Sequence, residues 1–313
     1  MLDFSHIPGT DVTWLTGAST TAVGTGMTWQ SWQKPRGKTM CSILLLGKGG
    51  NGGNGVVGAN STAAGGGGGG SGTMATLVMP LALLPDILYF SLAGQQATTT
   101  VASYVAIYPS IVATPPPNHT IMIANGGGNG GNGAGATAGA AGAAGSLTGM
   151  TAATMPLGWQ WSKVLAGQAG IIGGTTVTAA NLTLPVTGLI ITGGTGGGGL
   201  PAAAAAGTVG GSFTVPAQPS PFIPHTAPLS TATATVPPGD GAGGFKLPGL
   251  LYFYGGLGSG STHGTASGAG LVAARGGTGA FGCGGGGGGG ALTGSTVSSG
   301  GFGGPALAII TCW

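Results

Sequence analysis

Short apolar runs that lead directly into glycine tracts recur along this chain. Residues 41–46 (CSILLL) are followed by GKGGNGGNG, and residues 120–124 (TIMIA) are followed by NGGGNGGNG. The same order returns at 188–199 (GLIITGGTGGGG) and at 271–290, and residues 306–313 read ALAIITCW. Largely apolar runs of this length predict buried strands. We therefore expect a strand that continues into a glycine arm to be the unit of construction.

Further strands are predicted between the glycine tracts. Residues 84–94 (LPDILYFSLAG) and 101–108 (VASYVAIY) are rich in β-branched and aromatic residues, which favour strands. Residues 155–167 and 247–256 resemble 84–94. The intervals between these units are unequal, which favours loops of variable length on a common core over a solenoid of fixed period.

The composition excludes an ordinary globular core and also an ordinary disordered chain. Of 313 residues 74 are glycine and 20 are proline, which is typical of low-complexity sequence. Yet charged residues make up only 4%, the net charge is +3, and the mean hydropathy is +0.41, whereas disordered chains are polar and charged. The glycines must therefore be ordered by something other than side-chain packing, or remain as flexible linkers.

Backbone hydrogen bonds between arms are the available source of order. A polyproline-II helix has three residues per turn and no internal hydrogen bonds, so its N–H and C=O groups point sideways. Two such helices can bond to each other where no Cβ separates them, and glycine permits that approach. Ala, Asn, Ser and Thr, which interrupt the tracts, fit where a face points outward.

We therefore predict an all-β and irregular fold with essentially no α-helix. Short strands form the base of a bundle of polyglycine-II helices, and variable loops connect the arms. The glycines expected to form the structural arms recur at every third position, with one break at Ala136: Gly49, Gly52, Gly55, Gly130, Gly133, Gly139, Gly142 and Gly145.

Two regions are predicted along the chain. Residues 1–36 contain three tryptophans and few glycines, and we interpret them as an attachment segment that packs on something larger. Residues 37–313 form the glycine-rich domain. The stretch 215–238 is rich in proline and threonine and is predicted to be an extended excursion.

The chain offers little chemistry for catalysis. Its four aspartates and four histidines are scattered singly, without the pairing of an acid–base site or the spacing of a zinc site. Gly37-Lys38-Thr39 lacks the upstream glycine of a phosphate-binding loop, because Trp32 stands there. Cys41, Cys283 and Cys312 are expected to be free buried thiols. We expect no enzyme, no cofactor, no metal, no nucleic-acid partner and no membrane insertion.

Recognition of a partner fits the pattern better than catalysis. Rigid aromatic side chains provide a large contact area at a low entropic cost, and loop tips vary without disturbing a scaffold. Tyr252 and Phe253 are better explained as packing at the strand base, and Phe213 remains a further candidate. The residues predicted to contact a receptor are Trp159, Trp161, Phe222, His225 and Tyr254.

Three stretches resemble glycine-rich structural proteins of tailed bacteriophages. Residues 29–53 carry a W-x-x-W-x-K-P-R-G lead-in before an apolar strand and a glycine block. Residues 84–94 and 300–313 (GGFGGPALAIITCW) continue the likeness, which covers roughly residues 29–313. The tracts also resemble tail-tip adhesins whose polyglycine-II bundle carries receptor-binding loops, although no loop here matches those adhesins residue by residue.

The resemblance implies a virion protein of the tail fibre, tail tip or head fibre, assembled in the host cytoplasm and exposed on the particle. Its implied partners are other virion proteins through the N-terminal segment, a host cell-surface receptor, and copies of itself, most often as a trimer. Two alternatives remain open: a capsid decoration or head-fibre protein without a receptor role, and an ice-binding or cell-wall glycine-rich protein.

Overall fold

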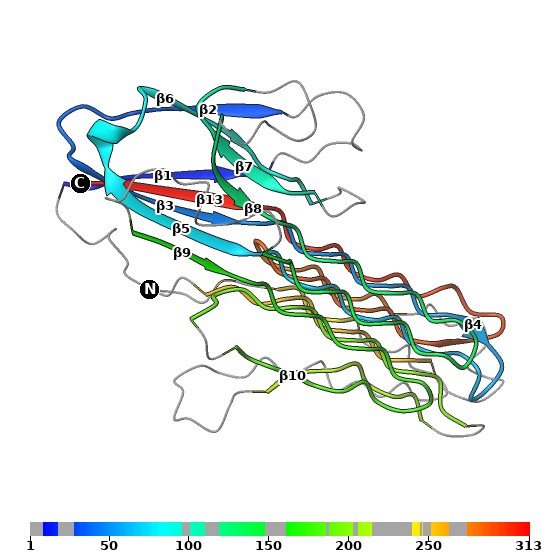
Figure 1. Ribbon diagram of the computed structural model, residues 1–313. Helices are drawn as coiled ribbons and strands as arrows, with labels where there is room; N and C mark the ends of the chain where they lie inside the picture. The colour runs from blue at the N-terminus through cyan, green and yellow to red at the C-terminus, as the bar shows by residue number, and fades with distance from the viewer. Residues whose placement is uncertain are drawn as a thin grey trace.

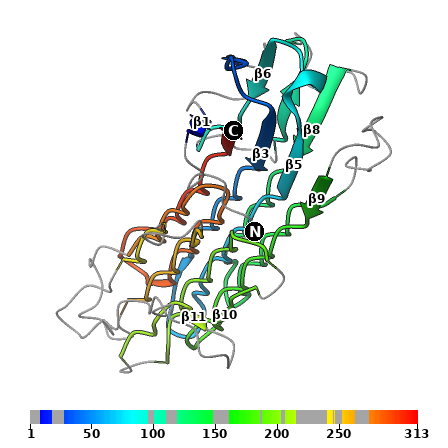
Figure 2. The same cartoon turned by 90° about the vertical axis from the view of Figure 1, so that its left-hand side faces the viewer.

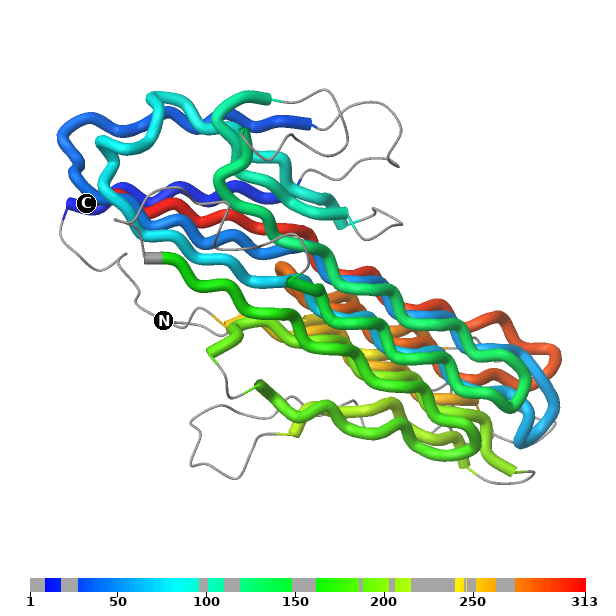
Figure 3. The backbone as a smooth tube through the Cα atoms, in the orientation of Figure 1, coloured from blue at the N-terminus to red at the C-terminus, as the bar shows by residue number. Residues whose placement is uncertain are grey.

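A base of β-strands continues into a long bundle of glycine arms (Figures 1 and 3). The computed structural model describes residues 9–17, 28–95, 101–109, 119–147, 161–185, 188–202, 206–214, 240–244, 246, 252–262 and 274–313. Within these residues there is no α-helix, and 3-10 structure is confined to η1 (Leu81–Leu83) and His119. The predicted all-β and irregular fold is thus confirmed.

The main sheet has five antiparallel strands in the order β1-β13-β3-β5-β9. Their bounds are β1 (Asp11–Thr16), β13 (Leu307–Cys312), β3 (Met40–Leu46), β5 (Met74–Pro80) and β9 (Trp161–Leu165). The predicted strands at 41–46 and 306–313 therefore pair with each other, although they lie at opposite ends of the chain.

A second sheet packs on one face of the main sheet (Figure 1). It has the order β2-β6-β7-β8, with β2 (Trp29–Gln33), β6 (Ile87–Ser91), β7 (Ser103–Ala106) and β8 (Thr120–Ala124). Ile43 and Leu45 of the main sheet meet Leu88 and Phe90 in a shared apolar core. Burial of both faces explains why β3 lacks the alternation of a half-exposed strand.

The opposite face of the main sheet is covered by residues 189–191 together with Phe253 and Cys283. Here the sequence prediction needs a correction, because 188–192 does not form a strand. Leu189, Ile190 and Ile191 are buried as expected, but they pack across the sheet instead of joining a ladder. Their apolar character therefore reflects packing against a face and not strand pairing.

The glycine arms bond sideways with a period of three. The N–H groups of Gly49, Gly52 and Gly55 donate to the carbonyl oxygens of Gly304, Gly301 and Ser298 at 2.9, 2.8 and 3.0 Å. Steps of three residues in both partners are what helices with three residues per turn produce. The arms are continuous with the strands, since β3, β8 and β9 lead out into the bundle while β5 and β13 receive returning arms (Figure 1).

The arm at residues 64–72 is completely surrounded. It exchanges backbone hydrogen bonds with six other arms, at residues 47–56, 125–134, 137–146, 167–174, 192–200 and 283–291. The arm 283–291 likewise has six neighbours: 47–56, 64–72, 192–200, 254–262, 274–282 and 298–305. The arrangement is therefore a hexagonal lattice with enclosed arms at its centre.

Position in the lattice explains the composition of each arm. Every position of an enclosed arm faces a neighbour, so glycine occurs without interruption at 65–70 and 284–290. A Cβ on Gly66 or Gly69 would lie under 3.0 Å from backbone atoms of the arm 47–56. Outer arms have one or two free positions in each turn, and they read GGN at 49–54 and GAA at 139–144.

The described N-terminal residues belong to the same two sheets. β1 is an edge of the main sheet and β2 an edge of the second. Trp32 is buried between the sheets, whereas Trp14 is 43% exposed and lies under the Lys246 ammonium at 4.9 Å from the ring centroid. The division at residue 36 thus does not coincide with a break in strand pairing.

Candidate functional site

Loops gather at the end of the bundle that lies far from the sheets (Figures 1 and 2). The described parts of this tip are residues 56–62, 134–137, 175–177, 200–202 and 292–297. Each joins an arm that runs out from the base to one that returns, or lies at the end of one. The tip is therefore built from segments that are far apart in sequence and close in space.

A small apolar cluster holds the tip together. Leu200 and Leu292 pack with Ala63 and Val56. Two short parallel strands, β4 (Val57–Gly58) and β12 (Ala291–Leu292), pair beside this cluster. A second short parallel pair, β10 (Leu182–Thr183) with β11 (Phe213–Thr214), lies elsewhere on the bundle. The cluster therefore holds the bases of the tip loops in fixed positions.

Tight turns and cross-loop bonds complete the tip. Ala134 and Thr137 exchange backbone hydrogen bonds at 2.9 Å, and Gly135 adopts a φ of 56° that side-chain-bearing residues rarely tolerate. The Ser61 N–H donates to the carbonyl of Pro201 at 3.2 Å, which joins two separate loops. The described loops are consequently ordered relative to one another.

The described tip surface is neutral and mixed in character. Val177 and Val297 are 58% and 60% exposed. Thr62, Thr175 and Thr293 are also exposed on the tip loops, and the Thr62 hydroxyl donates to the carbonyl of Ala59 at 2.7 Å. None of the tip residues that the structure describes carries a charge. Such a surface can bind an uncharged partner through hydroxyl hydrogen bonds and apolar contact, but it lacks groups for acid–base chemistry.

Of the aromatic residues predicted to contact a receptor, the two that the structure describes, Tyr254 and Trp161, do not lie at this tip. Tyr254 is only 1% exposed and packs against Phe213 and Tyr252 with ring centroids 5.6 and 5.1 Å apart, so it belongs to the core. Burial also raises the pKa of Tyr254. Trp161 is the first residue of β9 at the base, where it pairs with Val78. The remaining predicted contacts, Trp159, Phe222 and His225, lie outside the described residues.

Polar side chains on the arms have a role that the sequence prediction missed. Asn129 and Asn132 accept hydrogen bonds through Oδ1 from the backbone N–H groups of Asn51 and Asn54, at 2.9 and 2.8 Å. Asn51 and Asn54 in turn accept from Gly303 and Gly300. At these outer positions no neighbouring arm supplies a carbonyl acceptor, and the asparagine side chain accepts the hydrogen bond instead.

The same substitution occurs deep inside the bundle. The buried hydroxyl groups of Thr192 and Thr195 accept from the N–H groups of Gly255 and Gly258, both at 2.7 Å. The expectation that threonine and serine mark outward faces is therefore too simple. The sequence contains a signal for this role, because polar residues spaced three apart, such as Thr192 and Thr195, recur in several arms.

All eight glycines predicted as structural arms donate their N–H groups to carbonyls of neighbouring arms. Gly130 and Gly133 donate to Asn51 and Asn54, and Gly139, Gly142 and Gly145 donate to Gly65, Gly68 and Ser71. Lys48 occupies the same outward series as Asn51 and Asn54 but is only 1% exposed, and burial lowers its pKa to about 8.

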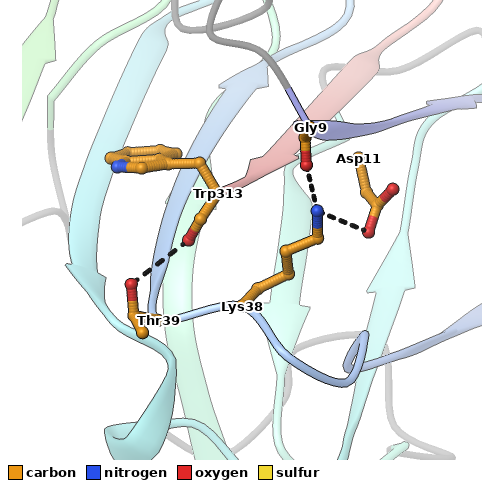
Figure 4. Close-up of polar contacts among 5 residues, drawn as sticks. All are labelled: Gly9, Asp11, Lys38, Thr39 and Trp313. Carbon is orange, nitrogen blue, oxygen red and sulfur yellow. Dashed lines mark hydrogen bonds and ion pairs between the residues drawn. The ribbon is translucent and has the colours of Figure 1, made fainter.

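A basic groove of about 530 Å³ lies at the base, at the opposite end from the tip. Its lining includes Lys34, Arg36 and Lys38. Lys34 pairs with the exposed Asp86 at 3.1 Å, and Lys38 lies 3.5 Å from the Asp11 carboxylate while donating to the carbonyl of Gly9 (Figure 4). Carboxylates therefore offset two of the three cations.

No protein-family model matches the sequence, and a search of curated proteins found no match. Among the described residues, no three His, Cys, Asp or Glu side chains approach closely enough to hold a metal ion. In that same part of the chain, no helix has the length and apolar character needed to cross a membrane.

Proposed function

We propose that this protein is a structural component of a tailed-bacteriophage virion, a tail fibre or tail-tip protein whose bundle projects from the particle and contacts the host surface. The observation that carries the proposal is that the two ends of the molecule are built differently. Strand-built sheets occupy one end, and ordered loops from distant parts of the chain gather at the other, with a hydrogen-bonded bundle between them.

The bundle supplies stiffness and reach. Seven glycines at 284–290 span roughly 22 Å at the 3.1 Å rise of this helix type. Because each enclosed arm bonds to six others, bending one arm requires displacing its neighbours. Loops at the tip can change in sequence while the lattice remains intact, which suits a surface selected to recognise variable receptors.

The base is the proposed attachment end. The basic groove and the edge strands β1 and β2 lie there, within or beside the predicted attachment segment. Other virion proteins and further copies of this chain, in a trimer by analogy with phage fibres, are the proposed partners. The tip is then left free for a host cell-surface receptor.

Electron microscopy of phage particles with a gold label on this protein tests the location. Label on the tail or on a projecting fibre supports the proposal, and label confined to the cytosol of infected cells rejects it. Binding of the purified protein to host cells separates receptor contact from the alternative of a capsid decoration protein, which would not bind.

Point variants locate the contact on the molecule. Val177→Asp and Val297→Asp place a charge on the tip, and Phe302→Asp places one on the flank of the bundle, where Phe302 is 48% exposed. We expect the tip variants to lose cell binding and the flank variant to retain it. Equal binding by all three would place the contact elsewhere.

A second function, ice binding, is favoured by one face of the bundle. The outer arm 137–146 exposes Ala140, Ala141 and Ala143, and the neighbouring arm exposes Ala169. This gives a more regular small-residue face than the sequence suggested. A measurement of thermal hysteresis tests it, and freezing behaviour equal to that of a control protein would exclude it.

A further inference from the structure

Cys41 and Cys312 face each other across two neighbouring strands. In the register of β3 and β13, Cys41 is the direct partner of Cys312. The adjoining residues Met40 and Trp313 exchange both backbone hydrogen bonds, at 3.1 and 3.2 Å. Hydrogen-bonded and non-hydrogen-bonded pairs alternate along an antiparallel ladder. Cys41 and Cys312 therefore form a non-hydrogen-bonded pair.

That position brings the two sulfur atoms within bonding reach. Residues in such a pair have Cα atoms about 4.5 Å apart and side chains on the same face. A disulfide requires a Cα separation of about 4.4–6.8 Å, so the backbone already satisfies the requirement. Both side chains lie in the core between the sheets, 0% and 1% exposed, and the two thiols share a hydrogen bond.

We propose that Cys41 and Cys312 are the two halves of a cross-strand disulfide that forms when the protein meets a small-molecule disulfide oxidant. In the structure all three cysteines are free, and Cys283 lies on the opposite face of the main sheet. The structure therefore assigns one bond between two particular residues and leaves the third thiol reduced.

The chemistry balances as two thiol–disulfide exchanges. Cys312 loses its proton to solvent, and its thiolate attacks one sulfur of the oxidant, which forms a mixed disulfide and releases a small thiolate that takes up a proton. Cys41 then loses its proton to solvent and attacks the Cys312 sulfur, which forms the protein disulfide and releases the second small thiol. The protein loses two hydrogen atoms, and one oxidant molecule becomes two thiols.

The surroundings favour Cys312 as the first nucleophile. The Cys41 S–H donates to the Cys312 sulfur, which lowers the pKa of Cys312 and raises that of Cys41. The Lys38 ammonium also lowers the Cys312 pKa, while burial and Asp11 oppose it. Lys38 and Asp11 lie at the end of the strand pair, beside Trp313 and Thr39 (Figure 4). The pair is thus one residue from the end of the sheet.

The bond would join residues that are separated by nearly the whole chain. Cross-links that close long loops restrict the unfolded chain most strongly. We expect oxidation to raise the melting temperature by roughly 5–10 °C. No sequence pattern predicts this pairing, because neither cysteine belongs to a short motif.

The test uses the full-length protein, reduced and then incubated with oxidised glutathione. Counting thiols after denaturation should show three before and one after oxidation, and peptide mapping should recover Cys41 linked to Cys312. Cys283→Ala should fall from two thiols to none with the same rise in melting temperature. Cys312→Ser should show no internal disulfide and no rise.

Two results would overturn the proposal. One is retention of all three thiols by the native protein under conditions that oxidise the unfolded protein. The other is a bond that involves Cys283 or that joins two chains while Cys41 and Cys312 stay reduced. Mass spectrometry under non-reducing conditions distinguishes each of these from the expected product.

Discussion

Replacing Gly68 with alanine probes the close approach of the enclosed arms. A Cβ on Gly68 would lie under 3.0 Å from the backbone of Gly194 and Thr195, where no flexible side chain can move aside. The two arms are tied on either side by hydrogen bonds from Gly194 to Gly69 and from Gly197 to Gly66, at 2.8 and 2.9 Å. The added methyl group must therefore separate arms that are bonded above and below it.

The magnitude follows from these contacts. Weakening two hydrogen bonds costs about 1 kcal/mol each, and overpacking adds about 1–3 kcal/mol. The lower entropy of the unfolded alanine chain offsets about 0.4–1 kcal/mol. We expect Gly68→Ala to lower the free energy of unfolding by about 2–5 kcal/mol, a large share of the roughly 5–15 kcal/mol typical of a protein.

Gly243→Ala is the matched control. Gly243 is exposed, and the nearest atom to its added Cβ is Thr278 Oγ1 at an ordinary 3.4 Å. We expect this variant to be unchanged or more stable by about 0.4–1 kcal/mol. Urea unfolding followed by far-ultraviolet circular dichroism measures both. If Gly68→Ala were as stable as Gly243→Ala, the arms would not be held at contact distance.

Two further predictions concern side chains of the arms. Asn132→Ala removes the acceptor for Asn54 N–H and should cost about 0.5–1.5 kcal/mol, whereas Asn132→Asp keeps an acceptor and should lose less; urea unfolding at pH 7 compares them. Burial lowers the pKa of Lys48 to about 8 from the usual 10.5, so the unfolded state binds more protons between these values and stability should rise with pH by up to about 3 kcal/mol. Lys48→Met should remove this rise and stabilise the protein at pH 7, and a flat pH profile for the unchanged protein between pH 8 and 10.5 would contradict the assignment.

Local patterns predicted the elements of the fold well. The apolar runs at 41–46, 120–124 and 306–313 became β3, β8 and β13, because an apolar run specifies burial wherever its partner lies. The period of three in the arms was also visible, since it arises within each arm. The run at 188–192 was misassigned, because burial against the face of a sheet and burial inside a ladder leave the same apolar pattern.

The arrangement of the arms and loops in space could not be predicted from the sequence. Which arm is enclosed depends on six neighbours from distant segments, although an unbroken glycine run is its local trace. Tyr254 was interpreted as a surface aromatic, yet Phe213, some forty residues earlier, packs against it. The tip loops carry no distinctive residues, and their proximity results from the lattice together with contacts such as the Leu200–Leu292 cluster, which join segments far apart in sequence. The role of the asparagine side chains as acceptors could not be predicted either, because it depends on which backbone N–H groups have no neighbouring arm to accept their hydrogen bond.

The period of three also fixes which residues of each arm face its neighbours and which face solvent. Removing one glycine ahead of Asn54 would turn every residue beyond the gap by a third of a turn about the arm axis. Asn54 would then point toward the neighbouring arm 125–134, as Gly53 does now, and a glycine would point toward solvent. Arms can therefore lengthen or shorten only in whole turns of three residues, each about 9 Å, and neighbouring arms must change together. The bundle can therefore change in length only by such steps, whereas its tip loops can vary by any number of residues.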